Sequence, residues 1–261
     1  MAYQHIRSDV REGVGVITLN RPEALNALTD PMKRELLDGL KGAERDENVR
    51  AVVLTGEGRG LCAGEALVEE LVKSAEPPID RTLRDLYHPV IERMRAIEKP
   101  IIAAVNGTCA GAGVSLALAA DFRIAADKAS FLMAFVKIGL VPDAGSTFFL
   151  PRFVGMTKAV EMCMTGDKVD AAGAESIGLV NRVVPHERLM EEALKLAGRL
   201  AQAPTKAIGL MKRAFDRSFR VDLADQLSYE AHLQAIAART ADFHEGVEAF
   251  LGKRPAVFRG R

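Results

Sequence analysis

Residues 101–120 carry no charged side chain, and this stretch limits most strongly what the chain can fold into. A helix of this length would be long enough to cross a bilayer. Asn106, Thr108 and several glycines interrupt the stretch, however, and its two halves differ in hydrophobic period. Residues 101–105 are typical of a buried strand, whereas 111–120 have the composition of a buried helix. We therefore predict a strand, a glycine-rich turn and a helix rather than a membrane span.

Strands and helices alternate along the first part of the chain, and helices follow one another in the last part. At the first helix, Asp30 is the expected N-cap and Pro31 the expected first helical residue. This order predicts an α/β protein with a helical C-terminal module. The expected strands are 14–19, 49–55, 101–105, 121–126, 130–133 and 181–184. Helices are expected from about 30, 80 and 111, the chain is expected to be mostly helical beyond 142, and successive helices are expected from 187 with breaks at 203–204, 220–222 and 240–242.

Composition and missing motifs exclude several classes of function. Lys plus Arg (35) equals Asp plus Glu (35), so no overall positive field attracts nucleic acid or an anionic membrane. The histidines never occur at metal-ligand spacing, and the chain has neither a phosphate-binding G-x-x-x-x-G-K-[ST] loop nor a G-x-S-x-G nucleophile turn. The cysteines are widely spaced and the N-terminus lacks an apolar signal segment, so we expect a cytoplasmic protein without disulfides or a bound metal.

Two turns built from small residues stand beyond neighbouring predicted strands. One covers residues 107–113 (GTCAGAG) and the other residues 61–65 (LCAGE). Taken singly, each is explained by close packing of a strand on a helix or by an ordinary loop. Small residues also let a ligand approach the backbone closely, so the alternative is that N–H groups of both turns converge on one developing oxyanion.

Asp143 is the third residue of interest. It follows Pro142 in the segment 139–145 (GLVPDAG) and precedes the apolar run 148–150. Two interpretations are open. Asp143 caps the helix that follows, or its carboxyl lies in an apolar pocket, where burial raises its pKa and lets it carry protons.

Four segments in order resemble the crotonase family, also called the enoyl-CoA hydratase/isomerase family. Residues 20–28 (NRPEALNAL) resemble its N-R-P-x-x-x-N-A-L segment, and residues 61–64 (LCAG) resemble its F-C-A-G turn. Residues 105–113 (VNGTCAGAG) resemble its V-N-G-x-x-x-G-G-G turn, and residues 246–254 (GVEAFLGKR) resemble its C-terminal signature. The resemblance extends over essentially the whole chain.

The resemblance implies a spiral of ββα units over residues 1–202 and a helical module over 203–261 that assembles the chain into a homotrimer or a dimer of trimers. It also implies an acyl-coenzyme A substrate and no further cofactor. The thioester oxygen of this substrate is expected to accept hydrogen bonds from the backbone N–H groups of Glu65 and Ala112. The residues expected along the coenzyme and substrate are Ala24, Leu25, Ala63, Gly64, Gly111, Phe135 and Leu140, with Phe250 and Lys253 supplied by a neighbouring subunit.

Departures from the family pattern bear on the reaction. Ser115 and Phe135 occupy the positions at which hydratases of the family carry two glutamates, whereas Asp143 occupies the position of the single acid of its isomerases. Residues 131–143 and the C-terminal stretch resemble the isomerases of phenylacetate breakdown. We therefore expect Asp143 to shuttle a proton, either converting a ring 1,2-epoxide of phenylacetyl-CoA to oxepin-CoA or a 3-enoyl-CoA to a 2-enoyl-CoA.

Two other functions are kept as alternatives. The first is an enoyl-CoA hydratase in which Asp143 alone activates water, and the second is a subunit that binds acyl-CoA without catalysis. Ala66 replaces an Asp found in many members of the family, and this departure has no explanation in the sequence. The segment 69–80 is expected to line the acyl end of the site.

Overall fold

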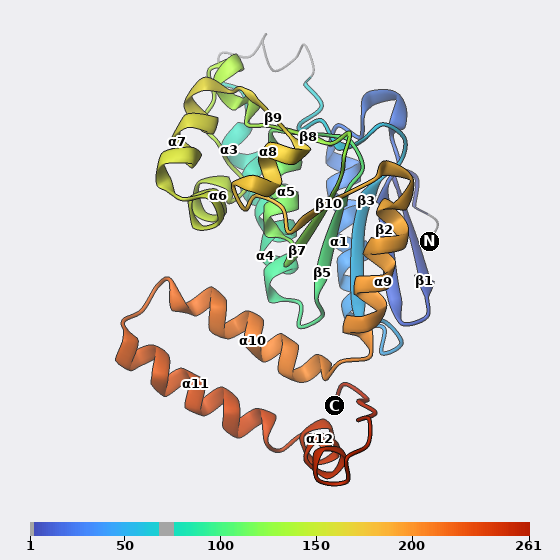
Figure 1. Ribbon diagram of the computed structural model, residues 1–261. Coiled ribbons are helices and arrows are strands. Elements are labelled where there is room, and N and C mark those ends of the chain that lie inside the picture. The colour runs from blue at the N-terminus through green and yellow to red at the C-terminus, as the bar shows by residue number, and fades with distance from the viewer. Residues whose placement is uncertain (1–2, 68–75) are drawn as a thin grey trace.

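Two β-sheets organise the chain, and the computed structural model describes residues 3–67 and 76–261. The larger sheet has the strand order β1-β2-β3-β5-β7-β10, in which β1 is antiparallel to β2 and the remaining neighbours are parallel (Figure 1). Its strands are β1 (Ile6–Arg11), β2 (Val14–Leu19), β3 (Ala51–Gly56), β5 (Ile101–Val105), β7 (Phe122–Ala126) and β10 (Arg182–Val184).

The smaller sheet is built from short strands in the order β4-β6-β8-β9. In three places the chain passes from a strand of the larger sheet to the next strand in the smaller one: from β3 to β4, from β5 to β6 and from β7 to β8. This repetition is the spiral of β-strand pairs that the family resemblance implied. The strands are β4 (Gly60–Cys62), β6 (Thr108–Ala110), β8 (Ser130–Leu132) and β9 (Lys168–Asp170).

Helices cover both faces of the larger sheet and continue beyond it. Figure 1 shows α9 crossing one face while α1 lies behind the strands. The α-helices are α1 (Asp30–Arg45), α3 (Ile79–Thr82), α4 (His88–Ala96), α5 (Ala112–Ala119), α6 (Ser146–Val154), α7 (Met156–Thr165), α8 (Ala171–Ser176), α9 (Leu189–Ala201), α10 (Thr205–Ser218), α11 (Leu223–Ala237) and α12 (Ala241–Leu251). Short tighter or wider helical turns are η1 (Pro22–Ala24), η2 (Leu83–Tyr87), η3 (Ala134–Ile138) and η4 (His186–Arg188).

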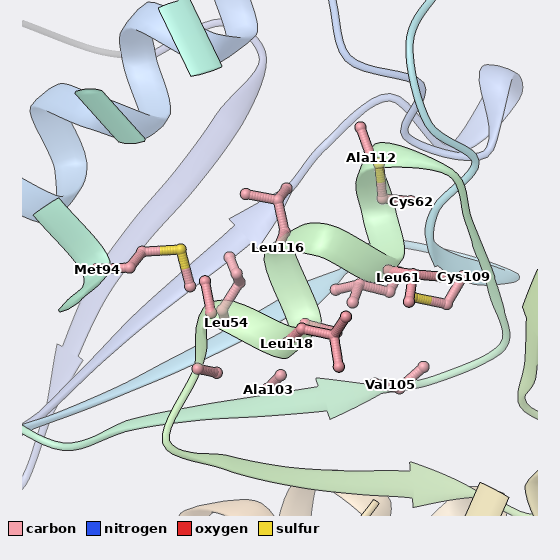
Figure 2. Close-up of a cluster of buried hydrophobic side chains, with 14 of the residues drawn as sticks. Leu54, Leu61, Cys62, Met94, Ala103, Val105, Cys109, Ala112, Leu116 and Leu118 are labelled. Carbon is pink, nitrogen blue, oxygen red and sulfur yellow. The ribbon is translucent and has the colours of Figure 1, made fainter. Parts of the chain in front are cut away.

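The central strands are buried on both faces, which explains their unbroken apolar sequences. In β3, Val52 and Leu54 point into the core shared with α1, α4 and α5, whereas Ala51 and Val53 point into the core beneath α9. Helix α5 is buried along its whole length, so it needs no polar face. Figure 2 shows side chains of α5 packed with those of β3, β4, β5 and α4.

Most of the expected elements are present, with differences at their ends. The strand 14–19 and the strand 101–105 have the predicted bounds, and the charge-free stretch holds the predicted strand and helix, with the short strand β6 within the predicted turn. No helix among residues 3–67 and 76–261 is both long and apolar enough to cross a membrane. The predicted N-cap is wrong: the Thr29 hydroxyl accepts the capping hydrogen bond from the Met32 N–H at 3.4 Å, and Asp30 is the first helical residue. The strands β1, β4, β6 and β9 were not predicted, since β1 is largely exposed and the others are only three residues long.

The helices α10 to α12 extend away from the sheets (Figure 1), and Arg50 contacts both the start of α10 and the segment after α12. The Arg50 guanidinium donates to the hydroxyl of Thr205 at 3.0 Å and to the carbonyl oxygen of Phe258 at 2.9 Å. The division at residue 203 coincides with the loop between α9 and α10. The division of the chain into a core of residues 1–202 and a helical oligomerisation module of residues 203–261 remains a prediction.

Candidate active site

The two small-residue turns lie against each other, because the strands that carry them are neighbours in the smaller sheet. Strand β4 pairs with β6 in parallel, with Cys62 opposite Cys109. A Cβ atom added to Gly64 would lie 3.2 Å from the Ala110 carbonyl oxygen, and one added to Gly111 would lie 3.9 Å from the Gly64 Cα. Gly64 and Gly111 also have positive φ angles of 101° and 49°. Glycine is therefore required at both positions by backbone conformation, and at Gly64 also by the close approach.

Each turn presents a backbone N–H group that is free to bind a ligand. Glu65 follows Gly64, and Ala112 is the first residue of α5, which has no side-chain cap. Within the described part of the chain, neither N–H donates a hydrogen bond to another group. The N-terminal end of α5 adds positive potential at Ala112. Two such donors next to each other fit an oxygen that gains negative charge during a reaction.

A cavity of about 240 Å³ opens beside these two residues. Its wall is largely apolar, with polar groups at a few positions, which is typical of a site for a small organic group. Three elements close it around the two turns: the segment 79–87, the turn η3 and the loop before α6. The lining residues are Ala63, Gly64, Glu65, Leu67, Ile79, Thr82, Leu83, Tyr87, Gly111, Ala112, Ala134, Phe135, Lys137, Ile138, Leu140 and Asp143.

Asp143 lines this cavity and does not cap a helix. Helix α6 begins at Ser146, its N-cap is Gly145, and no side chain accepts a capping hydrogen bond. The interpretation of Asp143 as an N-cap is therefore wrong, and the interpretation as a pocket carboxyl agrees with its position. Its backbone carbonyl oxygen accepts hydrogen bonds from the hydroxyl of Ser115 at 3.0 Å and from that of Ser146. Ser115 thus fixes the loop that carries Asp143.

The environment of the Asp143 carboxyl favours its protonated form. Its Oδ1 atom is buried, and among the described residues it has no hydrogen-bond partner. Burial and, to a smaller extent, the negative charge of Glu65 raise the pKa of Asp143 from 3.8 to about 6, while the charge of Lys33 opposes this rise. A carboxyl with a pKa near 6 can both accept and return a proton close to neutral pH.

The Glu65 side chain is held by two groups that the sequence analysis did not single out. The Lys33 ammonium, whose side chain is 1% exposed, lies 2.9 Å from each carboxylate oxygen of Glu65 and 3.0 Å from the Asp30 carboxylate. The Tyr87 hydroxyl donates to the Glu65 carboxylate, and the Lys33 ammonium also lies 4.6 Å from the centre of the Tyr87 ring. The sequence held one indication for Lys33: it stands three residues before Leu36, on the apolar side of the first helix, where a charged side chain needs a partner.

The structure brings eight of the twelve predicted site residues to the cavity: Ala63, Gly64, Glu65, Gly111, Ala112, Phe135, Leu140 and Asp143. Leu25 lies next to it, since its carbonyl oxygen accepts a hydrogen bond from the Ala63 N–H at 2.9 Å, and Ala24 precedes it in η1. Phe250 lies in the last turn of α12 and Lys253 just beyond its end, away from the cavity of the same chain. In the segment 69–80, Ile79 lines the cavity, while residues 68–75 lie outside the described part.

The chain is similar to known proteins over nearly its whole length. The sequence profile described as "Enoyl-CoA hydratase/isomerase" matches residues 9–261. The chain is 43% identical over 260 residues to the 1,2-epoxyphenylacetyl-CoA isomerase of Escherichia coli (strain K12), with 99% of each protein covered. It is 38% identical over 251 residues to the 2,3-dehydroadipyl-CoA hydratase of the same organism, covering 96% of this chain and 97% of the relative. The crystal structure of an enoyl-CoA hydratase from Bacillus anthracis superposes with a TM-score of 0.93 at 34% identity, covering 99% of this chain and 100% of that one.

Proposed function

This chain belongs to the enoyl-CoA hydratase/isomerase family, and on that premise we propose that it is an acyl-CoA isomerase in which Asp143 moves a proton between two carbons of the acyl group. One observation carries the proposal. Asp143 places a half-buried carboxyl in the cavity wall, with one buried oxygen that has no partner among the described residues, whereas the two positions that hold glutamates in hydratases carry Ser115 and Phe135. A single free acid is what a proton shuttle needs.

The first step requires stabilisation of an enolate. The thioester oxygen accepts hydrogen bonds from the N–H groups of Glu65 and Ala112, and these bonds strengthen as the oxygen becomes negatively charged. Removing one such donor typically raises the barrier by about 2.7–4 kcal/mol. The end of α5 at Ala112 adds to this stabilisation, because its backbone dipole points its positive end at the same place.

Asp143 then completes the reaction by taking and returning the same proton. For a 3-enoyl thioester, the Asp143 carboxylate removes a proton from the carbon next to the thioester carbonyl, and the electron pair spreads over the enolate oxygen and the 3,4 double bond. The protonated Asp143 returns the proton to the fourth carbon, the double bond moves to the 2,3 position and the carbonyl re-forms. Acid–base help of this kind contributes about 10²–10⁴-fold to the rate.

The residues around Asp143 favour isomerisation over addition of water. The Ser115 hydroxyl is turned toward the Asp143 backbone and is completely buried, so it is not available to hold a water molecule in the cavity. Phe135 and Leu140 form part of the apolar wall of the cavity that Asp143 lines. An apolar wall keeps water away from the enolate.

Hydration is the second candidate function, and one specific observation favours it. Glu65 brings a second carboxylate to the cavity that Asp143 lines. Hydratases among the similar proteins also make this reaction a natural competitor. The test is to mix the protein with crotonyl-CoA and follow the loss of enoyl absorbance, which occurs in a hydratase and not in the proposed isomerase.

The cavity wall is mainly apolar, which supports a proposal for the substrate class. We propose an uncharged acyl group, either the ring 1,2-epoxide of phenylacetyl-CoA or a linear 3-enoyl chain; the similarity to an epoxyphenylacetyl-CoA isomerase supports the former. The test is a product screen by liquid chromatography and mass spectrometry over both kinds of ester. Isomerised product from either ester supports the proposal. Binding of all the esters without any product would instead indicate a non-catalytic acyl-CoA-binding subunit.

We further propose that the working form is a homotrimer or a dimer of trimers. Large apolar side chains are exposed along α10 to α12, among them Phe215, Phe219, Leu223 and Phe250, the last of which is 82% exposed. Surfaces of this kind are normally covered by another protein surface. In such an assembly Phe250 and Lys253 of one subunit approach the coenzyme bound near Ala24 and Leu25 of its neighbour. Sedimentation equilibrium tests the oligomeric state, and a monomer would contradict it.

A further inference from the structure

The Glu65 side chain has no part in the reaction proposed above, although its backbone N–H does. Glu65 nevertheless lines the cavity, and its carboxylate contacts Lys33 and Tyr87. Lys33 comes from α1, 32 residues earlier, and Tyr87 comes from η2, 22 residues later. Asp143, from the loop before α6, lines the same cavity. Four segments that are distant in the sequence therefore place two carboxyl groups and one buried ammonium around one small site.

The two carboxyl groups differ in how they are satisfied. Both oxygens of Glu65 lie 2.9 Å from the Lys33 ammonium, and the Tyr87 hydroxyl donates a further hydrogen bond. Burial and the nearby Glu65 raise the pKa of Tyr87, so its hydroxyl stays protonated and remains a donor. Asp143, by contrast, has a buried oxygen without a partner among the described residues. Glu65 is thus held in place by two partners, whereas Asp143 is left free to change its protonation.

We propose that the Glu65 side chain is a positioning residue for the proton shuttle: Lys33 and Tyr87 hold its negative charge in the wall of the cavity that Asp143 lines, and that charge acts on the Asp143 carboxyl. The inference rests on the proposed role of Asp143. It adds a function for the side chain of a residue whose backbone N–H binds the thioester oxygen. The fixed carboxylate makes Asp143 a stronger base, which favours the first half of the shuttle, removal of the proton from carbon.

The sign of this effect follows from the charges around Asp143. A neighbouring negative charge disfavours ionisation of a carboxyl, and a neighbouring positive charge favours it. Glu65 therefore raises the pKa of Asp143, in addition to burial, while Lys33 lowers it by a smaller amount. The remaining charged group among the described cavity residues is Lys137 of η3, which is exposed at the rim. Tyr87 is neutral and acts through Glu65.

The test measures the titration of Asp143 directly. Protein labelled with ¹³C at aspartate carboxyls gives an Asp143 signal that is identified by its absence from Asp143→Asn. In the wild type we expect its midpoint at about 6. In Glu65→Gln, which keeps the size of the side chain and removes its charge, we expect the midpoint to fall by about 0.5–1 pH unit. The acidic limb of the profile of kcat/KM against pH should fall by the same amount, which a purely structural role of Glu65 does not produce.

Two further variants complete the design. Glu191→Gln removes one negative charge from the exposed side of α9 and should leave the midpoint unchanged. Glu65→Gln leaves the buried Lys33 with Asp30 as its partner, and if that variant does not fold, the double variant Lys33→Met and Glu65→Gln removes both buried charges together. Because Glu65 has the larger effect on Asp143, the midpoint should still fall in the double variant, although by less.

The outcomes separate this inference from the proposed function. A midpoint that stays in place or rises in the folded variant lacking Glu65 overturns the inference, even when Asp143→Asn is inactive. Turnover by Asp143→Asn overturns the proposed function, and the titration in the absence of substrate still reports whether Glu65 acts on Asp143. A lower midpoint with a matching shift of the acidic limb supports both.

Discussion

Replacing Asp143 with asparagine is expected to abolish isomerisation while making the protein more stable. The asparagine side chain has nearly the same shape and cannot take up a proton, so binding of the acyl-CoA ester should change little. Loss of acid–base help predicts that kcat falls by about 10²–10⁴-fold. The gain in stability has a separate cause, which is the cost of holding a charged carboxylate in a largely apolar cavity.

The size of that gain follows from the pKa of Asp143. Its pKa is raised from 3.8 to about 6, mainly by burial. Each unit corresponds to about 1.36 kcal/mol, so the upper limit at neutral pH is about 3 kcal/mol. Asp143 is partly exposed and solvent screens its charge, which reduces our expectation to about 1–2 kcal/mol. Since the folded pKa is the higher one, the wild type is stabilised by protonation below 3.8 and loses that contribution as the pH rises through about 6.

Urea unfolding at pH 5 and at pH 8 measures both the sign and the pH dependence. Asp143→Asn should exceed the wild type in free energy of unfolding at pH 8, and the difference should shrink at pH 5. Asp167→Asn, at an exposed position, is the matched control and should show no such dependence. The reasoning is refuted if Asp143→Asn keeps turnover within tenfold of the wild type. It is also refuted if this variant is less stable than the wild type at pH 8.

Three other changes test separate parts of the site. In the wild type, kcat/KM should decrease tenfold per unit as the pH falls below about 6, because Asp143 must be ionised to take a proton; a rate that is flat down to pH 4.5 would contradict this. Gly64→Ala should lower kcat by about 10²–10³-fold, because the added methyl group would lie 3.2 Å from the Ala110 carbonyl oxygen at a φ of 101° and would displace the turn that carries the Glu65 N–H. Wild-type kinetics in this variant would show that the turn tolerates the methyl group. Ser115→Ala removes one of the two hydroxyls that donate to the Asp143 backbone carbonyl oxygen, so thermal unfolding should show a loss of about 1 kcal/mol, and kcat should fall several-fold at unchanged KM. A kcat equal to that of the wild type would mean that the Ser146 hydroxyl alone holds the loop.

The sequence by itself determined the central strands and the glycine turns. The short, unbroken apolar run 101–105, closed by a glycine turn, is typical of a strand that is buried on both faces, and the structure has it as such. The positive φ angles at Gly64 and Gly111 are likewise local properties of the backbone, and glycine at these positions indicates them. The family resemblance placed Glu65 and Ala112 at the two turns, and the structure brings both to the same cavity.

Local sequence patterns predicted the structure less well where they allowed more than one interpretation. Thr29 and Asp30 are both good N-caps, and the choice of Thr29 depends on where the backbone enters the helix. The short strands β4 and β6 exist because each has the other as a neighbour, and three residues give no period to recognise. At Asp143, the sequence allowed a cap or a pocket carboxyl, and α6 starting at Ser146 decided between them.

Only the tertiary structure decided the environment of the two carboxyl groups. Lys33 and Tyr87 lie 32 and 22 residues from Glu65 along the chain, and the folding of α1 and η2 against the β4 turn brings them into contact. The ionisation of Asp143 depends in the same way on burial and on charges that come from other elements. Hydrogen bonds and Coulomb interactions act through space over a few ångströms, so their partners are fixed by the packing of distant segments, about which a local sequence pattern carries no information.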